Sequence, residues 1–360
     1  MILLIIVLIC LVIIGIIILI PGYTSSIKDT KGHKMQGSIA SLEKVKIGEQ
    51  EQWILIRGTD TKKPVILFLH GGPGTADMNL IRRYMHELEN HFVVVSWDQR
   101  GAGKSFAAIN PNSSMNINQF VSDACELTQM LCHRFNQEKI FLAGHSWGSV
   151  LGILSVNRQP DFYYAYIGIG QIVNMYENEK ISYEWTLERA KNANNKQAVE
   201  KLNKIGHPTY TGDNWQKKFM TERRLLAKFG GELYGSSKGA FPSVMRCLLR
   251  STEYNLLDKI NFFRGIFSTS RMIFFELMKI NLMEQAPVLN VPVYFVLGEH
   301  DYEAPSMIAE KYFSMLSAPS KELVWFENSA HMPTIEENEK FINLLINHVL
   351  PSVLAKVTVK

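Results

Sequence analysis

The sequence predicts an α/β protein: a mostly parallel, twisted sheet flanked by helices, with a helical region inserted into it. The first observation is a series of short apolar segments, which are typical of strands buried in a parallel sheet. These segments span residues 65–70, 92–97, 139–143, 291–298 and 322–326. The second observation is the helical spacing, with many Lys, Asn and Glu side chains, that separates the third segment from the fourth. We therefore expect two core halves, 41–170 and 287–360, and a helical cap (lid) over 171–286.

The N-terminal residues 1–20 form an apolar run without a charged side chain. At about 1.5 Å per residue, a helix of this length would span ~30 Å, the thickness of the hydrocarbon core of a bilayer. No basic segment precedes the run and no small-residue cleavage site follows it, which favours a retained anchor over a removed signal peptide. We predict a single-pass transmembrane helix over 1–20 in the cell membrane, followed by a polar tether over 21–40.

The orientation of this anchor depends on its flanking charges. Lys28, Lys31 and Lys34 follow the run, and no basic residue precedes it. The positive-inside rule then favours a folded domain that faces the cytoplasm. An outward-facing domain is the alternative.

Two further elements frame the predicted core. Alternating side chains in 44–47 and 52–56 predict an antiparallel hairpin. Apolar side chains recur at three- and four-residue steps over 341–349, which predicts a closing helix that ends before Pro351.

A Gly-x-Ser-x-Gly motif, residues 144–148, lies between the strand predicted at 139–143 and a helix predicted to end near Pro160. A sharp turn from strand to helix strains the serine backbone and exposes its hydroxyl above the sheet, and small residues on either side let the two elements approach closely. The positive end of the helix can also stabilise a developing oxyanion. Ser146 is therefore the predicted nucleophile.

A serine hydroxyl needs a base to accept its proton and an acid to orient that base. His331 follows the strand predicted at 322–326 and lies close to the C-terminus, which makes it the candidate base. Asp301 follows the strand predicted at 291–298 and is the candidate acid. Its neighbours Glu299 and Glu303 are alternatives for that role.

Donors for the oxyanion are expected from the glycine-rich segment 70–74, His-Gly-Gly-Pro-Gly, which directly follows a predicted strand. Glycines without side chains let a backbone N–H face a substrate carbonyl. We expect the N–H groups of Gly72 and Trp147 to form the oxyanion hole.

The segment 98–105 contains Gly-Lys-Ser but does not fit a phosphate-binding loop, because Asp98 stands where that motif requires a glycine. Residues 109–114 are rich in turn formers, so no helix is expected to follow. We therefore predict no nucleotide binding, and an internal pair between Asp98 and Arg100.

Composition excludes several other kinds of site. The four cysteines show no metal-ligand spacing, and Cys125 and Cys132 lie about 10 Å apart along a predicted helix, too far to form a disulfide. We expect no metal, no cofactor and no nucleic-acid partner. The net charge is +4, whereas 171–286 holds eighteen Lys and Arg against twelve Asp and Glu, a net charge of +6.

The order nucleophile, acid, histidine is that of an α/β-hydrolase. The blocks His-Gly-Gly-Pro-Gly at 70–74, Asp-Gln-Arg-Gly-x-Gly-x-Ser at 98–105 and Gly-x-Ser-Trp-Gly at 144–148 resemble the prolyl aminopeptidase (proline iminopeptidase) family of that fold. The resemblance extends over about 40–350. It implies a triad of Ser146, Asp301 and His331, with Gly72 and Trp147 in the oxyanion hole.

Peptidase members of this family hold the free amino end of the substrate with glutamates of the cap. The resemblance offers Glu253, which is followed by an aromatic residue, and Glu184 as a second possibility. The basic cap argues against a pocket that selects a cation, although local placement matters more than net charge.

Together these patterns predict a membrane-anchored serine hydrolase that works through an acyl-enzyme and releases the N-terminal residue of short peptides. An esterase or amidase acting on a small lipophilic substrate is the nearest alternative. A non-catalytic receptor on a hydrolase scaffold is an alternative of another class.

Overall fold

The structure is a computed structural model that describes residues 20–109, 115–208, 210, 212 and 214–357. Its centre is an eight-stranded sheet in the order β1-β2-β4-β3-β5-β6-β7-β8. The two pairs at the β1 edge are antiparallel and the other five pairs are parallel. The strands are β1 (Ile39–Ile47), β2 (Gln50–Gly58), β3 (Val65–Leu69), β4 (Val93–Asp98), β5 (Ile140–His145), β6 (Tyr163–Ile169), β7 (Val293–Gly298) and β8 (Lys321–Phe326).

Alternating side chains of the central strands enter two separate cores. On β3, Val65, Leu67 and Leu69 pack into one core, whereas Ile66 and Phe68 pack into the core on the opposite face. Strands buried on both faces have continuous apolar sequences, which is why these strands were predictable.

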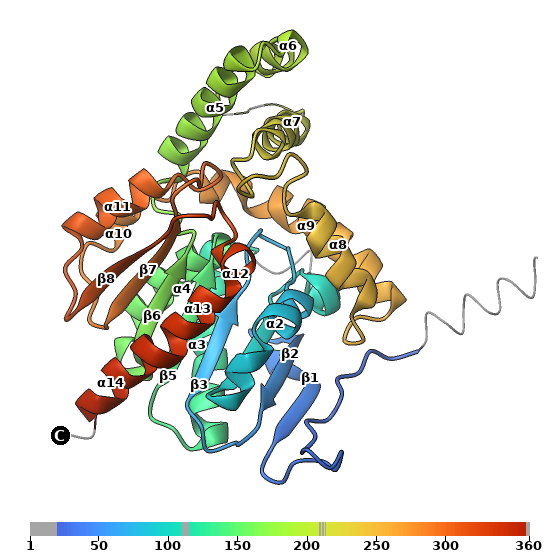
Figure 1. The fold of residues 1–360 in the computed structure, drawn as a ribbon, viewed down its shortest axis with the longest axis vertical. Helices are drawn as coiled ribbons and strands as arrows, with labels where there is room; N and C mark the ends of the chain where they lie inside the picture. The colour runs from blue at the N-terminus through green and yellow to red at the C-terminus, as the bar shows by residue number, and fades with distance from the viewer. Residues whose placement is uncertain (1–19, 110–114, 209, 211, 213, 358–360) are drawn as a thin grey trace, which may run out of the picture.

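Helices cover both faces of the sheet (Figure 1). Residues of α3, α4 and α11 share the first core, and residues of α2, α13 and the C-terminal turns share the second. The helical elements of the core are α2 (Met78–Tyr84), η1 (His86–Asn90), η2 (Gly103–Ala108), α3 (Ile117–Phe135), α4 (Trp147–Arg158), η3 (Pro160–Phe162), α11 (Ser306–Met315), α12 (Pro333–Glu336), α13 (Asn338–Leu344), η4 (Leu345–Val349) and α14 (Leu350–Val357).

The cap lies between β6 and β7 in the chain and extends beyond one end of the sheet (Figure 1). Its helices are α5 (Met175–Asn192), α6 (Lys196–Ile205), α7 (Trp215–Lys228), α8 (Phe241–Arg250), α9 (Leu256–Leu277) and α10 (Leu282–Gln285). Trp215 stacks on Phe274 with ring centroids 4.1 Å apart, and Trp185 stacks on Tyr302 at 4.2 Å. These aromatic side chains therefore pack within the cap or against the core.

The closing helix differs from its prediction, because it does not end before Pro351. A π-helical turn, η4, follows α13, and α14 continues through Pro351 to Val357. A proline lacks the N–H that a regular helix would use, but the π-helical turn just before Pro351 already changes the regular hydrogen-bond pattern there. Val353, beyond the proline, is buried in the second core, so packing favours continuation.

The predicted anchor over 1–20 lies outside the described residues except for Ile20. Within the described parts of the chain, no helix is long and apolar enough to cross a membrane. Most of the predicted tether, 21–40, precedes β1 and contacts the folded domain: the N–H of Tyr23 donates to the carbonyl of Thr252 at 2.9 Å, and Arg57 donates to the hydroxyl of Thr24 at 2.7 Å.

Candidate active site

Ser146 occupies a strained turn between β5 and α4. Its φ is +54° with ψ −121°, and its N–H donates to the carbonyl of Ile169 at 3.0 Å, which holds the turn against β6. A Cβ at Gly144 would lie 2.3 Å from the carbonyl oxygen of Gly148, and a Cβ at Gly148 would lie 2.1 Å from that of Leu69. Only glycine fits at both positions, so this local sequence forces the serine outward, where it is half-buried.

The glycine-rich loop after β3 lies directly beside this turn. Gly72 has φ +115°, and a Cβ there would lie 2.7 Å from the backbone nitrogens of Gly74 and Thr75. Both Gly72 and Ser146 line one cavity. Trp147 begins α4, and the first N–H groups of a helix have no partner within it, so the N–H of Trp147 is available to an oxyanion.

Gln99 fixes the loop and the turn relative to each other, a role that the sequence patterns did not indicate. Its side-chain amide donates to the carbonyl of His70 at 3.1 Å and accepts the indole N–H of Trp147 at 2.9 Å. The N–H of Gln99 also donates to Nε2 of His70 at 3.1 Å. All three residues are buried. The block 98–105 therefore supports the glycine-rich loop and the turn at Ser146.

The loops after β7 and β8 bring Asp301 and His331 together, although 30 residues separate them. Nδ1 of His331 lies 2.8 Å from Oδ2 of Asp301. The other carboxylate oxygen of Asp301 accepts the N–H groups of Glu303 at 2.9 Å and Ala304 at 2.8 Å. Nε2 of His331 has no hydrogen-bond partner among the described residues, and His331 lines the same cavity as Ser146. The geometry is that of a base whose orientation is fixed and whose second nitrogen is free.

The charges around His331 favour its protonated form. Burial lowers the pKa of His331, but the negative charge of Asp301 and then that of Glu303 outweigh burial and raise it to about 9. Burial raises the pKa of Asp301, while its contact with His331 acts in the opposite direction. An imidazolium is thus well stabilised at this position, as is required of a base that accepts a proton during the reaction.

His145, next to Ser146, is a second histidine that the sequence patterns did not single out. Its Nε2 lies 2.9 Å from the carbonyl of His331, and the two rings are 4.9 Å apart between centroids. Burial, followed by the nearby charge of His331, lowers the pKa of His145 to about 3. A neutral His145 can donate to the His331 loop without competing for its proton.

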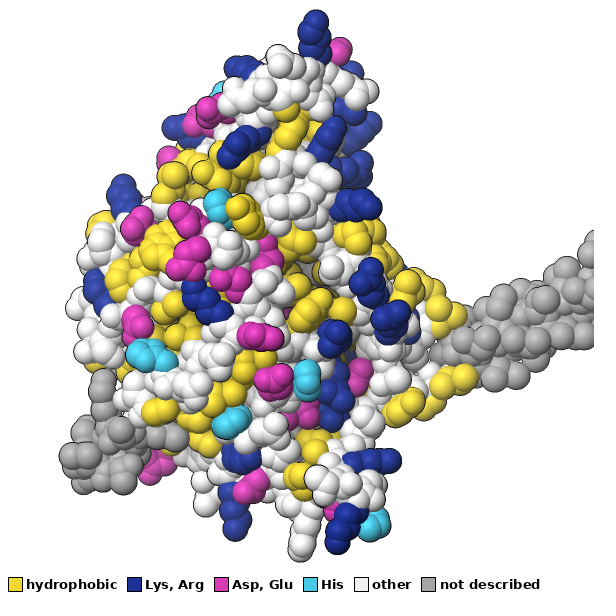
Figure 2. Space-filling model, in the orientation of Figure 1, with side chains coloured by type: hydrophobic (Ala, Val, Ile, Leu, Met, Phe, Trp, Pro, Cys, Tyr) yellow, Lys and Arg dark blue, Asp and Glu magenta, His cyan; other side chains and the backbone are white. Residues whose placement is uncertain are grey.

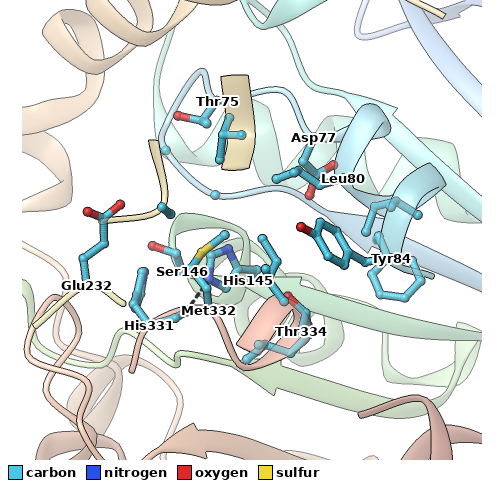
Figure 3. A pocket seen from close by; sticks show the side chains of 18 of the residues that line it. Thr75, Asp77, Leu80, Tyr84, His145, Ser146, Glu232, His331, Met332 and Thr334 are labelled. Atoms are coloured by element: carbon cyan, nitrogen blue, oxygen red, sulfur yellow. Dashed lines mark hydrogen bonds between the residues drawn. The ribbon is translucent and has the colours of Figure 1, made fainter. Parts of the chain in front are cut away.

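The cavity above Ser146 has a volume of about 260 Å³ and an uneven distribution of polarity. Figure 3 shows Glu232 and His331 on one side of Ser146, and Leu80 and Tyr84 on the other. Glu303 also lines the cavity. Burial, together with the charge of Glu303, raises the pKa of Glu232 to about 7. Glu232 and Glu303 therefore make one end of the cavity acidic, whereas the other end is largely apolar but also contains the carboxyl group of Asp77, whose pKa is raised by burial.

The two glutamates suggested by resemblance lie elsewhere. Glu253 is buried outside the cavity, where it accepts hydrogen bonds from Thr24 at 3.2 Å and Ser251 at 2.8 Å. Glu184 is exposed on α5 and does not line the cavity either. Glu232 and Glu303, which do line it, lie in loops without a helical or strand pattern, so no signal in the sequence marked them as cavity residues.

The predicted pair of Asp98 and Arg100 does not form. Arg100 donates from Nε to Asp123 at 3.0 Å, whereas Asp98 accepts the hydroxyl of Tyr254 at 2.7 Å and the N–H of Lys104 at 2.8 Å. Burial raises the pKa of Asp98 to about 7. Alternation along the strand end and the turn places these two side chains in different environments.

Among the described residues, no group of three His, Cys, Asp or Glu side chains is arranged to hold a metal ion. The described cysteines, Cys125, Cys132 and Cys247, are free thiols.

Comparison with known proteins identifies the family. The model of the alpha/beta hydrolase fold matches residues 64–337. The chain is 36% identical over 320 residues to a probable aminopeptidase, YbaC, of Bacillus subtilis, covering 86% of this chain and 96% of the relative. It is 26% identical over 300 residues to a proline iminopeptidase of Clostridioides difficile, covering 81% and 91% of the two chains.

A solved structure agrees on the fold. The proline iminopeptidase of Mycobacterium smegmatis superimposes with a TM-score of 0.61 at 20% identity, covering 88% of this chain and 100% of that one. The resemblance that the sequence motifs indicated is thereby confirmed. The chain belongs to the α/β-hydrolase family, and its relatives there are prolyl aminopeptidase-like proteins.

Proposed function

We propose that this protein is a membrane-anchored serine hydrolase that removes the N-terminal residue of short peptides through an acyl-enzyme. Ser146 attacks the carbonyl carbon of the first peptide bond while His331 accepts the hydroxyl proton. His331 then delivers that proton to the leaving amine as the C–N bond breaks. A water molecule, deprotonated by the same histidine, releases the amino acid and restores the serine.

The other site residues have supporting roles in this scheme. Asp301 keeps the imidazole oriented and stabilises its charged form. The N–H groups of Gly72 and Trp147 stabilise the oxyanion, and losing one such donor typically costs about a hundred- to a thousandfold in rate.

The observation that carries the choice of an aminopeptidase is the acidic end of the cavity. Glu232 and Glu303 line the cavity that contains Ser146 and His331. A buried ammonium group is costly unless a carboxylate pairs with it. Arg223 lies 4.0 Å from Glu303 and has further acidic partners, Glu179 and Glu222, so it neutralises Glu303 only in part. A free amino end is the substrate group that best complements this arrangement.

The size of the cavity is consistent with a short substrate, because a volume of about 260 Å³ lies just below the usual range for ligand sites. An amine held beside Glu232 places the adjacent carbonyl toward Ser146, while the apolar end lies across Ser146 from Glu232 (Figure 3). The net charge of +6 of the cap does not oppose this reading, since the cap residues at the cavity include Glu232.

Two measurements test the proposal. A fluorophosphonate probe should label the wild type and not Ser146→Ala. Labelling that persists in Ser146→Ala would overturn the assignment of the nucleophile, and a wild type that is not labelled would favour a receptor.

The second measurement concerns the substrate. Aminoacyl arylamides, including prolyl arylamide, should be cleaved by the wild type, and Glu232→Gln should raise KM for them at least tenfold. Glu184→Gln, an exposed glutamate of the same cap, is the matched control and should behave as wild type.

The second candidate is an esterase or amidase for a small lipophilic substrate. The apolar walls that α8 and α9 contribute to the cavity, including Phe241, Met245 and Phe262, favour it. Turnover of acyl esters by a protein that leaves every aminoacyl arylamide intact would favour this candidate over the peptidase.

A further inference from the structure

The outward side of the α8–α9 hairpin carries an exposed apolar stripe. On α9, Leu256, Ile260, Phe263 and Phe267 recur at four-, three- and four-residue steps and are 39–55% exposed. Leu249 on α8 is 70% exposed. Large apolar side chains gathered on one exposed helix face mark a surface that contacts something other than water. We call these five residues the α8–α9 stripe.

The charged side chains of α8 and α9 that reach the surface around this stripe are cationic. Residues 241–275 contain five cationic side chains, Arg246, Arg250, Lys259, Arg264 and Arg271, and two acidic ones. The acidic ones, Glu253 and Asp258, are buried, and Asp258 pairs with Lys104 at 2.7 Å. Figure 2 shows basic and hydrophobic side chains side by side over this edge of the molecule. Apolar side chains flanked by cations match a bilayer with anionic headgroups.

The first described residues of the chain contact the turn between α8 and α9, the hairpin that carries the stripe. Besides the bond between Tyr23 and Thr252, Gly22 packs so closely on the turn between α8 and α9 that a Cβ there would lie 2.0 Å from the carbonyl oxygen of Glu253. The apolar run of the sequence directly precedes this contact. A span leaving the domain at this point brings the bilayer surface beside the stripe.

We propose that the α8–α9 stripe lies on the surface of an anionic bilayer, with its apolar side chains at the level of the headgroups. This inference rests on the anchor proposed for residues 1–20. Phe241, at the start of α8, is 60% exposed and also lines the catalytic cavity, so the hairpin that carries the stripe also forms part of the cavity wall. The membrane then holds the cap in a fixed orientation as well as tethering the chain.

The test is a depth measurement on the full chain in vesicles. Cys10 and Cys247 are replaced by serine, and an environment-sensitive fluorophore is attached at Ile260→Cys. The matched control carries it at Met315→Cys, an apolar residue that is 59% exposed at the end of α11, away from the cap hairpin. Vesicles of phosphatidylcholine with phosphatidylglycerol contain doxyl-labelled lipid as a quencher, and flotation reports whether the protein is bound.

We expect lipid quenching at position 260 and none at position 315. Because each cation near an anionic surface changes the binding equilibrium by about fivefold, Arg250→Glu with Arg264→Glu should reduce the ratio of quenched to unquenched protein by at least that factor. Protein that floats with vesicles but is unquenched at 260 overturns the docked stripe and leaves the anchor intact. A fluorophore at 260 that is shielded from water without lipid quenching indicates a second copy or another part of this chain, and also overturns it.

Protein that does not float overturns both the anchor and the stripe. Fluorophosphonate labelling of Ser146 in every variant reports the proposed chemistry independently of vesicle binding, so failure of the serine hydrolase assignment is distinguishable from failure of membrane docking.

Discussion

The pKa of His331 leads to a prediction about Glu303. Removing the charge of Glu303 from the cavity should increase the hydrolysis of a neutral ester at pH 7 and decrease the cleavage of aminoacyl arylamides. The base must be neutral before it can accept the proton of Ser146. With a pKa of about 9, His331 in the free protein is mostly protonated at pH 7. The difference from the ordinary value of 6.5 corresponds to about 3 kcal/mol in favour of the imidazolium.

Glu303→Gln removes one source of that stabilisation. A unit charge several ångströms away contributes on the order of 2 kcal/mol at an effective dielectric constant of about 20. Glu303 is 29% exposed and lies 4.0 Å from Arg223, so we take half of that figure. The pKa of His331 should then fall by roughly one pH unit, toward about 8.

The assay is the pH dependence of kcat/KM for a neutral acyl ester, which has no amine that could titrate. In the wild type, kcat/KM should rise with pH to a half-maximum near 9. The Glu303→Gln profile should lie roughly one unit lower, so the variant is about tenfold faster at pH 7. Its activity on aminoacyl arylamides should fall, because the acidic end has lost a carboxylate.

Glu299→Gln is the matched control, because Glu299 precedes Asp301 in the same loop but does not line the catalytic cavity. An ester profile that is identical in wild type and Glu303→Gln, or one that shifts to higher pH, would refute the electrostatic argument.

The same pKa determines the direction in which the stability of the fold changes with pH. A raised histidine pKa stabilises the fold below about pH 6.5, and that contribution is lost as the pH rises toward about 9.

Three further changes test the supports of the site. Gln99→Met leaves the indole N–H of Trp147 and a buried carbonyl without partners, and should lower the free energy of unfolding in urea by about 2–5 kcal/mol. Asp98→Asn should make the free energy of unfolding less dependent on pH. Burial raises the pKa of Asp98 to about 7, so the free energy of unfolding of the wild type should fall by up to about 4 kcal/mol as the pH rises from about 4 to 7. Gly298→Ala places a Cβ 2.0 Å from the carbonyl oxygen of Ala330, and should reduce kcat roughly ten- to a hundredfold by displacing the loop that carries the base, with thermal unfolding remaining cooperative.

Each of these expectations has a contrary outcome. Wild-type stability in Gln99→Met would mean that the amide does not join the oxyanion loop to the nucleophile turn. An Asp98→Asn variant as pH-sensitive as the wild type would place the titrating group elsewhere. Full activity in Gly298→Ala would show that the two loops after β7 and β8 adjust without moving His331.

Local sequence was sufficient for the elements whose structure depends on near neighbours. Strands β3, β5 and β7 were predictable because a strand covered on both faces must be apolar throughout. The nucleophile turn was predictable because close approach of strand and helix excludes every side chain at positions 144 and 148. Strand β6 was missed: tyrosines and a glycine interrupt its apolar pattern, and its polar Tyr166 hydroxyl is satisfied only through Ser149 and Gln171.

Only the tertiary structure decided which charged side chains are buried next to one another. Glu232 and Glu303 come from loops 71 residues apart, and no periodic pattern connects them. Glu253, which the motif resemblance offered, instead accepts hydrogen bonds from Thr24 and Ser251 outside the cavity that contains Ser146. The sequence by itself therefore determined the backbone of the turn at Ser146 and the types of residue that we propose for the chemistry. The placement of the acidic end, and with it the proposed substrate class, required the folded chain, because an electrostatic environment depends on distances between segments that the order of residues does not specify.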